Sequence, residues 1–152
     1  MERDSQYYID KGFIDVSDNA EFRKIADAAS CFGKEYRGLQ RSYFKHPRET
    51  GKRLWFPKFY ENKEWSNRIS DDETAIISTS KLPHKVEENV DKVLAENNDS
   101  IIVFGRSKNA EGKMMYHFKG EYRLNASASN YEKGLVYERI GTRVQTYPNA
   151  QS

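Results

Sequence analysis

The sequence has 152 residues, a formal net charge of +2 and a hydrophobic share of 37%, and its 13% share of aromatic residues can build the core of a single domain spanning 1–152. No run approaches the roughly 20 apolar residues of a membrane span, and no apolar run follows Met1, so we expect no membrane segment and no secretory signal, and a cytoplasmic protein. Cys31 is the single cysteine, which excludes an internal disulfide and a thiolate metal cluster.

The first part of the chain predicts an extended lead-in over 1–17, with a short strand at 13–16. Asp18, followed three residues later by Glu21, is typical of a capping box at the start of a helix. We therefore predict an amphipathic helix over 19–32. Its apolar face consists of residues at helical spacing, namely Phe22, Ile25, Ala26 and Ala29.

The middle of the chain alternates short strands with turns. The pattern favours strands over 35–44, 53–56 and 74–79, whereas 60–72 is polar and irregular. A second helix should begin near Pro83, since proline is tolerated in the first turn of a helix.

The C-terminal third has the clearest pattern, because its apolar residues either run together or alternate. The run over 101–106 predicts a buried strand, and the alternation over 116–124 predicts a strand with one buried face. A last strand covers 136–145. Short links between sequential strands imply an antiparallel meander. We therefore predict an α+β fold, with a mostly antiparallel curved sheet or β-barrel and two flanking helices.

The charge lies in blocks, and the most basic block also holds many rings. Residues 34–60 contain eight Lys or Arg, two Asp or Glu, and seven aromatic residues. Basic residues between aromatic rings suit a polyanion with stackable bases, although a strand-rich core with lysines outside would give the same composition. The candidate phosphate contacts are Arg37, Arg41, Lys45, Lys52 and Arg53, with Arg139 and Arg143 extending the basic surface.

The most unusual segment has five aromatic residues in twelve, counted from Trp55. Trp55, Tyr60 and Trp65 could form aromatic walls, and Asn67 or Asp71 could hydrogen-bond the edge of a base. Such a slot can hold a base that has been extruded from the duplex. The alternative is that these rings only fill the core.

Four segments carry a resemblance to a known group of proteins. They read WFPKFYENKEWSNRIS, SIIVFGRSK, YHFKGEYRLN and GLVYERIGTRVQTYP, and together they span about 36–148. They resemble the SRA-like (SET and RING associated) and PUA-like modules that sit beside nuclease domains in bacterial and phage restriction endonucleases. The resemblance implies a curved β-barrel that binds DNA and senses a modified base such as methylcytosine or hydroxymethylcytosine. It also implies a nuclease domain or subunit as partner.

No catalytic residue, metal or cofactor is predicted. The three histidines, His46, His84 and His117, are far apart, and no group of residues has metal-ligand spacing. Cys31 is expected to be a small core residue.

Two alternatives to a DNA reader remain at this stage. Tyr36-Arg37-Gly38 and the later Ser78-Thr79-Ser80 are similar to the arginine and serine motifs with which arginine-type ADP-ribosyltransferases hold NAD. The Glu-x-Glu pair of that family is missing. The other alternative is a protein-interaction domain of mobile-element origin, whose acidic block at 61–100 would face a basic partner.

Overall fold

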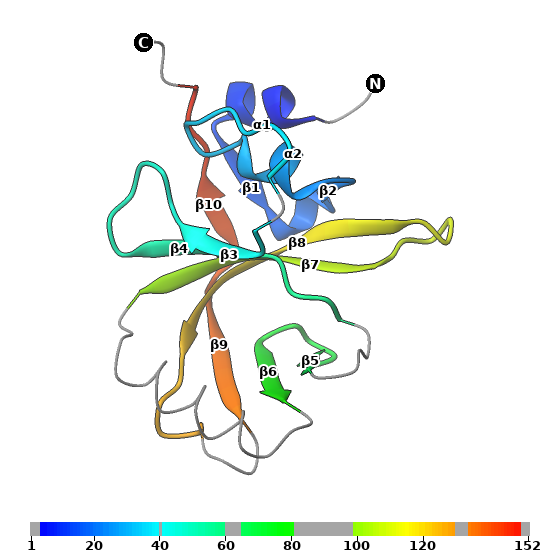
Figure 1. The fold of residues 1–152 in the computed structure, drawn as a ribbon, viewed down its shortest axis with the longest axis vertical. Helices are drawn as coiled ribbons and strands as arrows, with labels where there is room; N and C mark the ends of the chain where they lie inside the picture. Colours follow the sequence, from blue (N-terminus) through cyan, green and yellow to red (C-terminus); the bar gives the residue numbers. More distant parts are fainter. Residues whose placement is uncertain (1–3, 40, 60–64, 81–98, 130–133, 150–152) are drawn as a thin grey trace.

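The computed structural model describes residues 4–39, 41–59, 65–80, 99–129 and 134–149 (Figure 1). The helices are α1 (Ser5–Lys11) and α2 (Ile25–Ala29), with a 3-10 turn, η1 (Val16–Asp18). The strands are β1 (Phe13–Asp15), β2 (Glu21–Phe22), β3 (Tyr43–Lys45), β4 (Lys52–Trp55), β5 (Trp65–Ile69), β6 (Ala75–Ser80), β7 (Ser100–Lys108), β8 (Met114–Leu124), β9 (Leu135–Gly141) and β10 (Arg143–Gln145).

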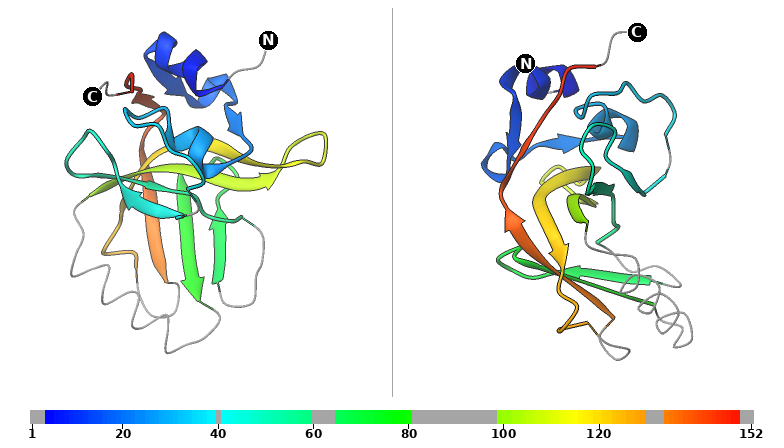
Figure 2. Two further views of the ribbon diagram at one scale, coloured as in Figure 1. Left: turned by 45° about the horizontal axis from the view of Figure 1, so that its top comes forward. Right: turned by 90° about the vertical axis from the view of Figure 1, so that its left-hand side faces the viewer.

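The main sheet has eight strands in the order β3-β4-β7-β8-β9-β6-β5, with β2 paired to β8, while β1 and β10 form a separate two-stranded sheet. All pairs are antiparallel except β4 with β7. The predicted meander is present as β7-β8-β9. Figure 2 shows that the sheet curves strongly, and no described pairing joins its edges β3 and β5. The curved-sheet prediction is therefore confirmed, and the described strands form no closed barrel.

The N-terminal helices differ from the sequence prediction. The lead-in contains α1, because the Asp4 side chain caps it by accepting a hydrogen bond from the Tyr7 N–H, and Gly12 ends it at φ 90°. The helix predicted over 19–32 is wrong except for α2. Asn19 turns the chain at φ 51°, and β2 then pairs with β8, so strand pairing overrides the helical periodicity.

Most of the strand predictions are confirmed within a few residues. The exceptions are the strand expected over 35–44, of which only its last two residues lie in β3, and the irregular segment 60–72, which contains β5. The last predicted strand is divided at Thr142 between the two sheets. The helix expected near Pro83 lies outside the described residues.

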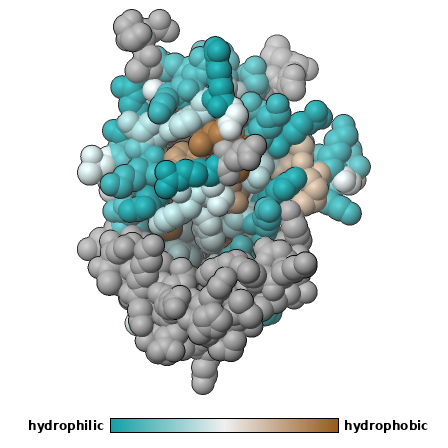
Figure 3. Space-filling model, viewed as in Figure 1, coloured by the Kyte–Doolittle hydropathy of each residue, from teal (hydrophilic) through white to brown (hydrophobic). Residues whose placement is uncertain are grey.

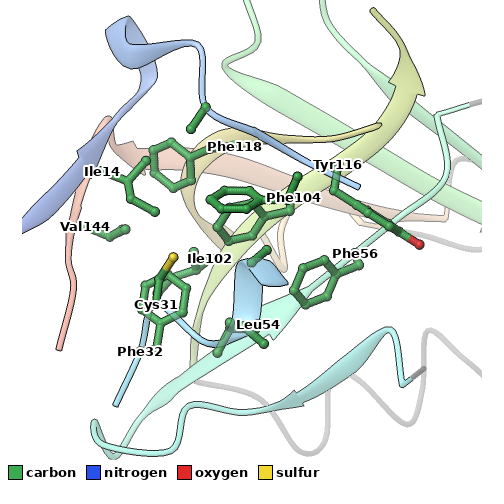
Figure 4. Packing of buried hydrophobic residues seen from close by; sticks show 14 of the residues in the cluster. Ile14, Cys31, Phe32, Leu54, Phe56, Ile102, Phe104, Tyr116, Phe118 and Val144 are labelled. Atoms are coloured by element: carbon green, nitrogen blue, oxygen red, sulfur yellow. The ribbon is translucent and has the colours of Figure 1, made fainter. Parts of the chain in front are cut away.

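The first of two hydrophobic clusters lies between the main sheet and the N-terminal elements (Figure 4). Phe104 is at its centre, with the ring centroids of Phe22, Phe32, Phe56 and Phe118 between 5.4 and 6.1 Å away. Cys31 is fully buried in this cluster, as predicted, and its burial raises the pKa of the thiol.

The second cluster lies on the other face of the same sheet. Its buried members are Ile76, Ile101, Val103, Tyr122, Leu135 and Tyr137. Successive β7 residues alternate between the clusters, because neighbouring side chains of a strand point to opposite faces. Among the described residues, α1 and α2 contribute to the first cluster only. We call the face that carries the second cluster the inner face.

Hydrophilic side chains cover most of the described part of the surface seen in Figure 3, with smaller apolar areas between them. The described part of the chain includes no helix whose length and hydropathy would let it cross a bilayer.

Candidate nucleic-acid interface

Asn67 is held on the inner face by two hydrogen bonds. It lies in β5 in register with Ser78 of β6, and its Oδ1 accepts a hydrogen bond of 2.7 Å from the Ser78 hydroxyl. Its Nδ2 donates to the carbonyl oxygen of Lys58 over 3.4 Å. An amide offers two donor hydrogens and two acceptor lone pairs, so one of each remains for a ligand. The amide is half-buried and fixed in orientation, which suits it to read the edge of a base.

Trp55 supplies an aromatic ring to the same face. It is half-buried, packs against the second cluster, and its ring centroid lies 5.2 Å from that of Tyr137. Tyr137 is only 6% exposed, and burial raises the pKa of its hydroxyl. Trp55 therefore packs against the second cluster while the residue remains partly exposed.

Residues 56–59, which follow β4, connect Trp55 to the anchor of Asn67. They run beside the end of β7, where the Arg106 N–H donates to the carbonyl of Pro57 over 2.7 Å and the Phe59 N–H donates to the carbonyl of Arg106 over 3.0 Å. The Phe59 ring covers Gly105, at which an added Cβ would lie 2.0 Å from a ring carbon. These contacts fix Lys58, whose carbonyl anchors Asn67.

The remaining predicted pocket residues are not all brought to this place. Trp65 occupies the first position of β5, opposite Ser80, and its side chain lies outside the described residues, as does Tyr60. Asp71 is exposed in the turn between β5 and β6. Its neighbour Asp72 shapes that turn, because hydrogen bonds from Thr74 and Ser70 to the carboxylate lower its pKa to about 2.

Three of the predicted phosphate contacts share one edge of the sheet. Lys45 of β3 is exposed and lies in register with Arg53 of β4, beside Lys52. Arg53 is paired with Asp99, with 2.9 Å between Nε and Oδ2. Lys52 is paired with Glu121, with 3.3 Å between Nζ and Oε2. A phosphate would therefore replace existing carboxylate partners at two of these three positions.

The other predicted basic residues lie apart from this edge. Arg37 and Arg41 are exposed in the loop that precedes β3. Arg139 donates from Nη1 to the Lys119 carbonyl over 3.3 Å. Arg143 lies in the two-stranded sheet, where it is 3.1 Å from Asp15. The structure thus does not gather Arg139 and Arg143 with the basic block.

The two ADP-ribosyltransferase-like motifs are also far apart in the sheet. Arg37 precedes the edge strand β3, whereas Ser78 lies in β6 and donates its hydrogen bond to Asn67. Four strands separate β3 from β6. Within the described ranges, no group of three His, Cys, Asp or Glu side chains could hold a metal ion.

His46 stabilises the turn that joins β3 to β4. It is 6% exposed, and its Nδ1 accepts hydrogen bonds of 3.0 Å from the backbone N–H groups of Arg48 and Glu49. Desolvation lowers the pKa of the imidazole below its usual 6.5, although Glu49, whose Oε2 lies 3.7 Å from Nε2, opposes the shift. The neutral ring is the form that holds this turn.

We therefore expect His46 to make the protein less stable in mild acid. As the pH falls below 6.5, the unfolded chain takes up a proton that the native imidazole resists, so the free energy of unfolding decreases until the lowered native pKa is reached. Urea unfolding at pH 7.5, 6.5 and 5.5 measures this loss. His46→Asn keeps an acceptor for both N–H groups and cannot titrate, so its pH dependence over this range should be shallower. Equal slopes for the two proteins would contradict the assignment.

The chain is similar to a known protein family and to a solved structure. Residues 7–146 match the model of the SET and RING associated domain family. The solved structure titled "The 5-Hydroxymethylcytosine-Specific Restriction Enzyme AbaSI" is similar to this chain, with a TM-score of 0.88 and 33% sequence identity over 96% of this chain and 46% of that one. This chain therefore spans less than half the length of that protein. No match was found among the curated proteins. Since the family match covers nearly the whole sequence, the resemblance to SRA-like modules is confirmed, and the chain belongs to the SET and RING associated (SRA) domain family.

Proposed function

We propose that this chain binds DNA and senses a modified cytosine on the inner face of its sheet. The observation that carries the proposal is the fixed amide of Asn67, held by Ser78 and the Lys58 carbonyl on the face that also bears the half-exposed ring of Trp55. The same fold occurs in a restriction enzyme whose title names 5-hydroxymethylcytosine as its target. The two lines of support are independent of each other.

The chemistry of the amide fits an extruded cytosine. The Watson–Crick edge of cytosine presents the N4 amino group as donor and N3 as acceptor. The free acceptor and donor of Asn67 complement that pair, while an aromatic ring such as Trp55 stacks on the face of the base. Trp65, two residues before Asn67 on β5, and Tyr60 are proposed as further walls. We assign base reading to Asn67 rather than to Asp71, which lies in the exposed turn beyond β5.

Phosphate contacts would supply affinity without sequence information. Lys45, Lys52 and Arg53 on the β3–β4 edge are the proposed contacts, together with Arg37 and Arg41 in the preceding loop. Arg139 and Arg143 are left out of this set because they lie in β9 and β10, apart from the β3–β4 edge.

The partner of such a reader would be a nuclease domain or subunit. This chain covers 46% of the AbaSI chain, so the similarity concerns only a part of that restriction enzyme. We propose that the chain directs a nuclease activity to modified DNA in the cytoplasm. The comparisons give no support to an ADP-ribosyltransferase.

The test is a gel-shift series with unmodified, methylated and hydroxymethylated duplexes of one sequence. We expect tighter binding to a modified duplex, and a loss of affinity for every duplex when salt is raised from about 50 to about 200 mM, because released counterions oppose binding. Absence of binding at low salt would remove the DNA-binding proposal. Equal affinity for all three duplexes would remove the sensing of a modification.

A further inference from the structure

A second basic feature lies on the side of the sheet that carries the first cluster. It is a hollow of about 590 Å³ whose lining includes Arg23, Lys24, Lys58 and Arg106. Its apolar lining includes Phe56 and Tyr116, which Figure 4 shows side by side at the end of the first cluster away from Ile14 and Val144. We call this feature the cationic hollow.

The four cations come from three distant parts of the sequence. Arg23 and Lys24 lie in the link between β2 and α2. Lys58 and Arg106 are partners in an isolated parallel bridge, which is formed by the hydrogen bonds from the Arg106 N–H to the Pro57 carbonyl and from the Phe59 N–H to the Arg106 carbonyl. The convergence is therefore a product of the tertiary fold and is fixed by backbone pairing.

Three of the four cations that line the cationic hollow have no acidic partner among the described residues. Arg23, Lys24 and Lys58 are exposed, and among the described residues no carboxylate lies within ion-pair distance of these three. Arg106 lies over the Tyr116 ring, 5.6 Å from its centroid. This differs from the β3–β4 edge, where Lys52 and Arg53 form ion pairs with carboxylates. Cations gathered without acidic partners repel each other, and a bound anion relieves that repulsion.

The acidic surroundings limit where an anion can bind. Arg23 and Lys24 also border a second hollow, whose lining includes the carboxylates Asp18, Glu21 and Asp27. An anion is repelled from that side and attracted toward Lys58 and Arg106. The cationic hollow thus has a preferred end, formed by Lys58 and Arg106.

Lys58 contacts both sites, which lie on opposite faces of the sheet. Its carbonyl accepts the hydrogen bond from Asn67, while its side chain lines the cationic hollow. We propose that the cationic hollow binds backbone phosphates of the DNA strand that carries the sensed base. This inference rests on the proposed function, because it takes the strand at Asn67 as its starting point. Phosphate oxygens are the anions that Arg and Lys side chains bind most readily in DNA complexes.

Charge-neutralising variants of the full chain test the proposal. Arg23→Gln and Lys58→Gln alter exposed side chains and keep the Lys58 carbonyl, and Lys113→Gln, in the turn between β7 and β8, is the matched control. Each hollow variant should weaken binding to unmodified and hydroxymethylated duplexes by the same factor. Each should also reduce the slope of log affinity against log salt by about 1. The control should leave both quantities unchanged.

The possible results separate this inference from the proposed function. If the wild-type chain prefers modified DNA and the hollow variants match it in affinity and salt slope, the cationic hollow is not a phosphate site, and the proposed function stands. If Lys58→Gln loses only the preference for the modified base, Lys58 acts through Asn67, and the inference is overturned. A wild-type chain that binds no duplex overturns the proposed function first.

Discussion

Replacing Asn67 with alanine should bring the affinity for a hydroxymethylated duplex close to that for an unmodified one. A modification can be sensed only while the base occupies the inner face, and Asn67 is the residue proposed to hold its edge there. Loss of a bidentate pair between a side chain and a base costs about 1–3 kcal/mol. The Watson–Crick edge is the same in both bases, but in the proposal only the modified base is retained on the inner face, so this cost falls on the hydroxymethylated duplex. We therefore expect the ratio of the two affinities to fall by about tenfold to a hundredfold. Competition gel shifts between the two duplexes measure this ratio.

Two further substitutions sharpen this prediction. Asn67→Asp keeps the acceptor for Ser78 but removes the donor, so it should lose the preference as fully as alanine does. Arg68→Lys, on the opposite face of β5, should bind like the wild type. Retention of the full preference in Asn67→Ala, in a protein that unfolds as cooperatively as the wild type, would show that Asn67 does not read the base.

The strands were predictable from sequence wherever burial gave a local pattern. Residues 101–104 of β7 are buried on both faces and form a continuous apolar run, and successive residues of β8 alternate between buried and partly exposed. These two patterns suffice to predict the meander. The helix over 19–32 was not predictable in this way, because Phe22 fits a helical face and an edge strand equally well. Its pairing with Tyr116 depends on residues far along the chain.

The helix α1 carried a signal that could have found it. Asp4 stands at the N-cap position and Gly12 just after the last helical residue, which is the spacing of a short capped helix. Its apolar face is small, with Tyr8 as its only buried residue, so periodicity gave little indication. Capping residues were therefore more informative here than hydrophobic spacing.

The candidate site was predicted in part, for a clear physical reason. Trp55 begins the aromatic-rich run and Asn67 directly follows it, so their closeness in the sequence suggested a shared site. The cationic hollow could not be predicted, because Lys58 and Arg106 meet through a parallel bridge between segments that no local pattern connects. For the same reason, the sequence did not show that some cations of the basic block 34–60 have acidic partners. Ion pairs with Asp99 and Glu121, distant in sequence, neutralise part of it.

At Gly105 a single added methyl group should destabilise the fold and also disturb the inner face. A Cβ there would lie 2.0 and 2.4 Å from two carbons of the Phe59 ring, so Gly105→Ala forces the ring to move. Overpacking of this kind costs about 1–3 kcal/mol of unfolding free energy. Gly105→Val should cost more, since its branched side chain needs still more space. Urea unfolding compared at constant m-value measures the loss.

Matched substitutions can assign this cost to Phe59 rather than to the removal of any glycine from a strand. Gly141→Ala, at the end of β9, would place its Cβ no closer than 3.9 Å to a neighbouring atom, so its effect should stay within about 0.5 kcal/mol. Phe59→Leu combined with Gly105→Ala should recover part of the lost stability, since the smaller side chain leaves room for the methyl group. Because Phe59 holds the segment whose carbonyl anchors Asn67, Gly105→Ala should also weaken the preference for a modified duplex. If Gly105→Ala were as stable as Gly141→Ala, the Phe59 ring could not be seated over Gly105, and the support proposed for Asn67 would have to come from elsewhere.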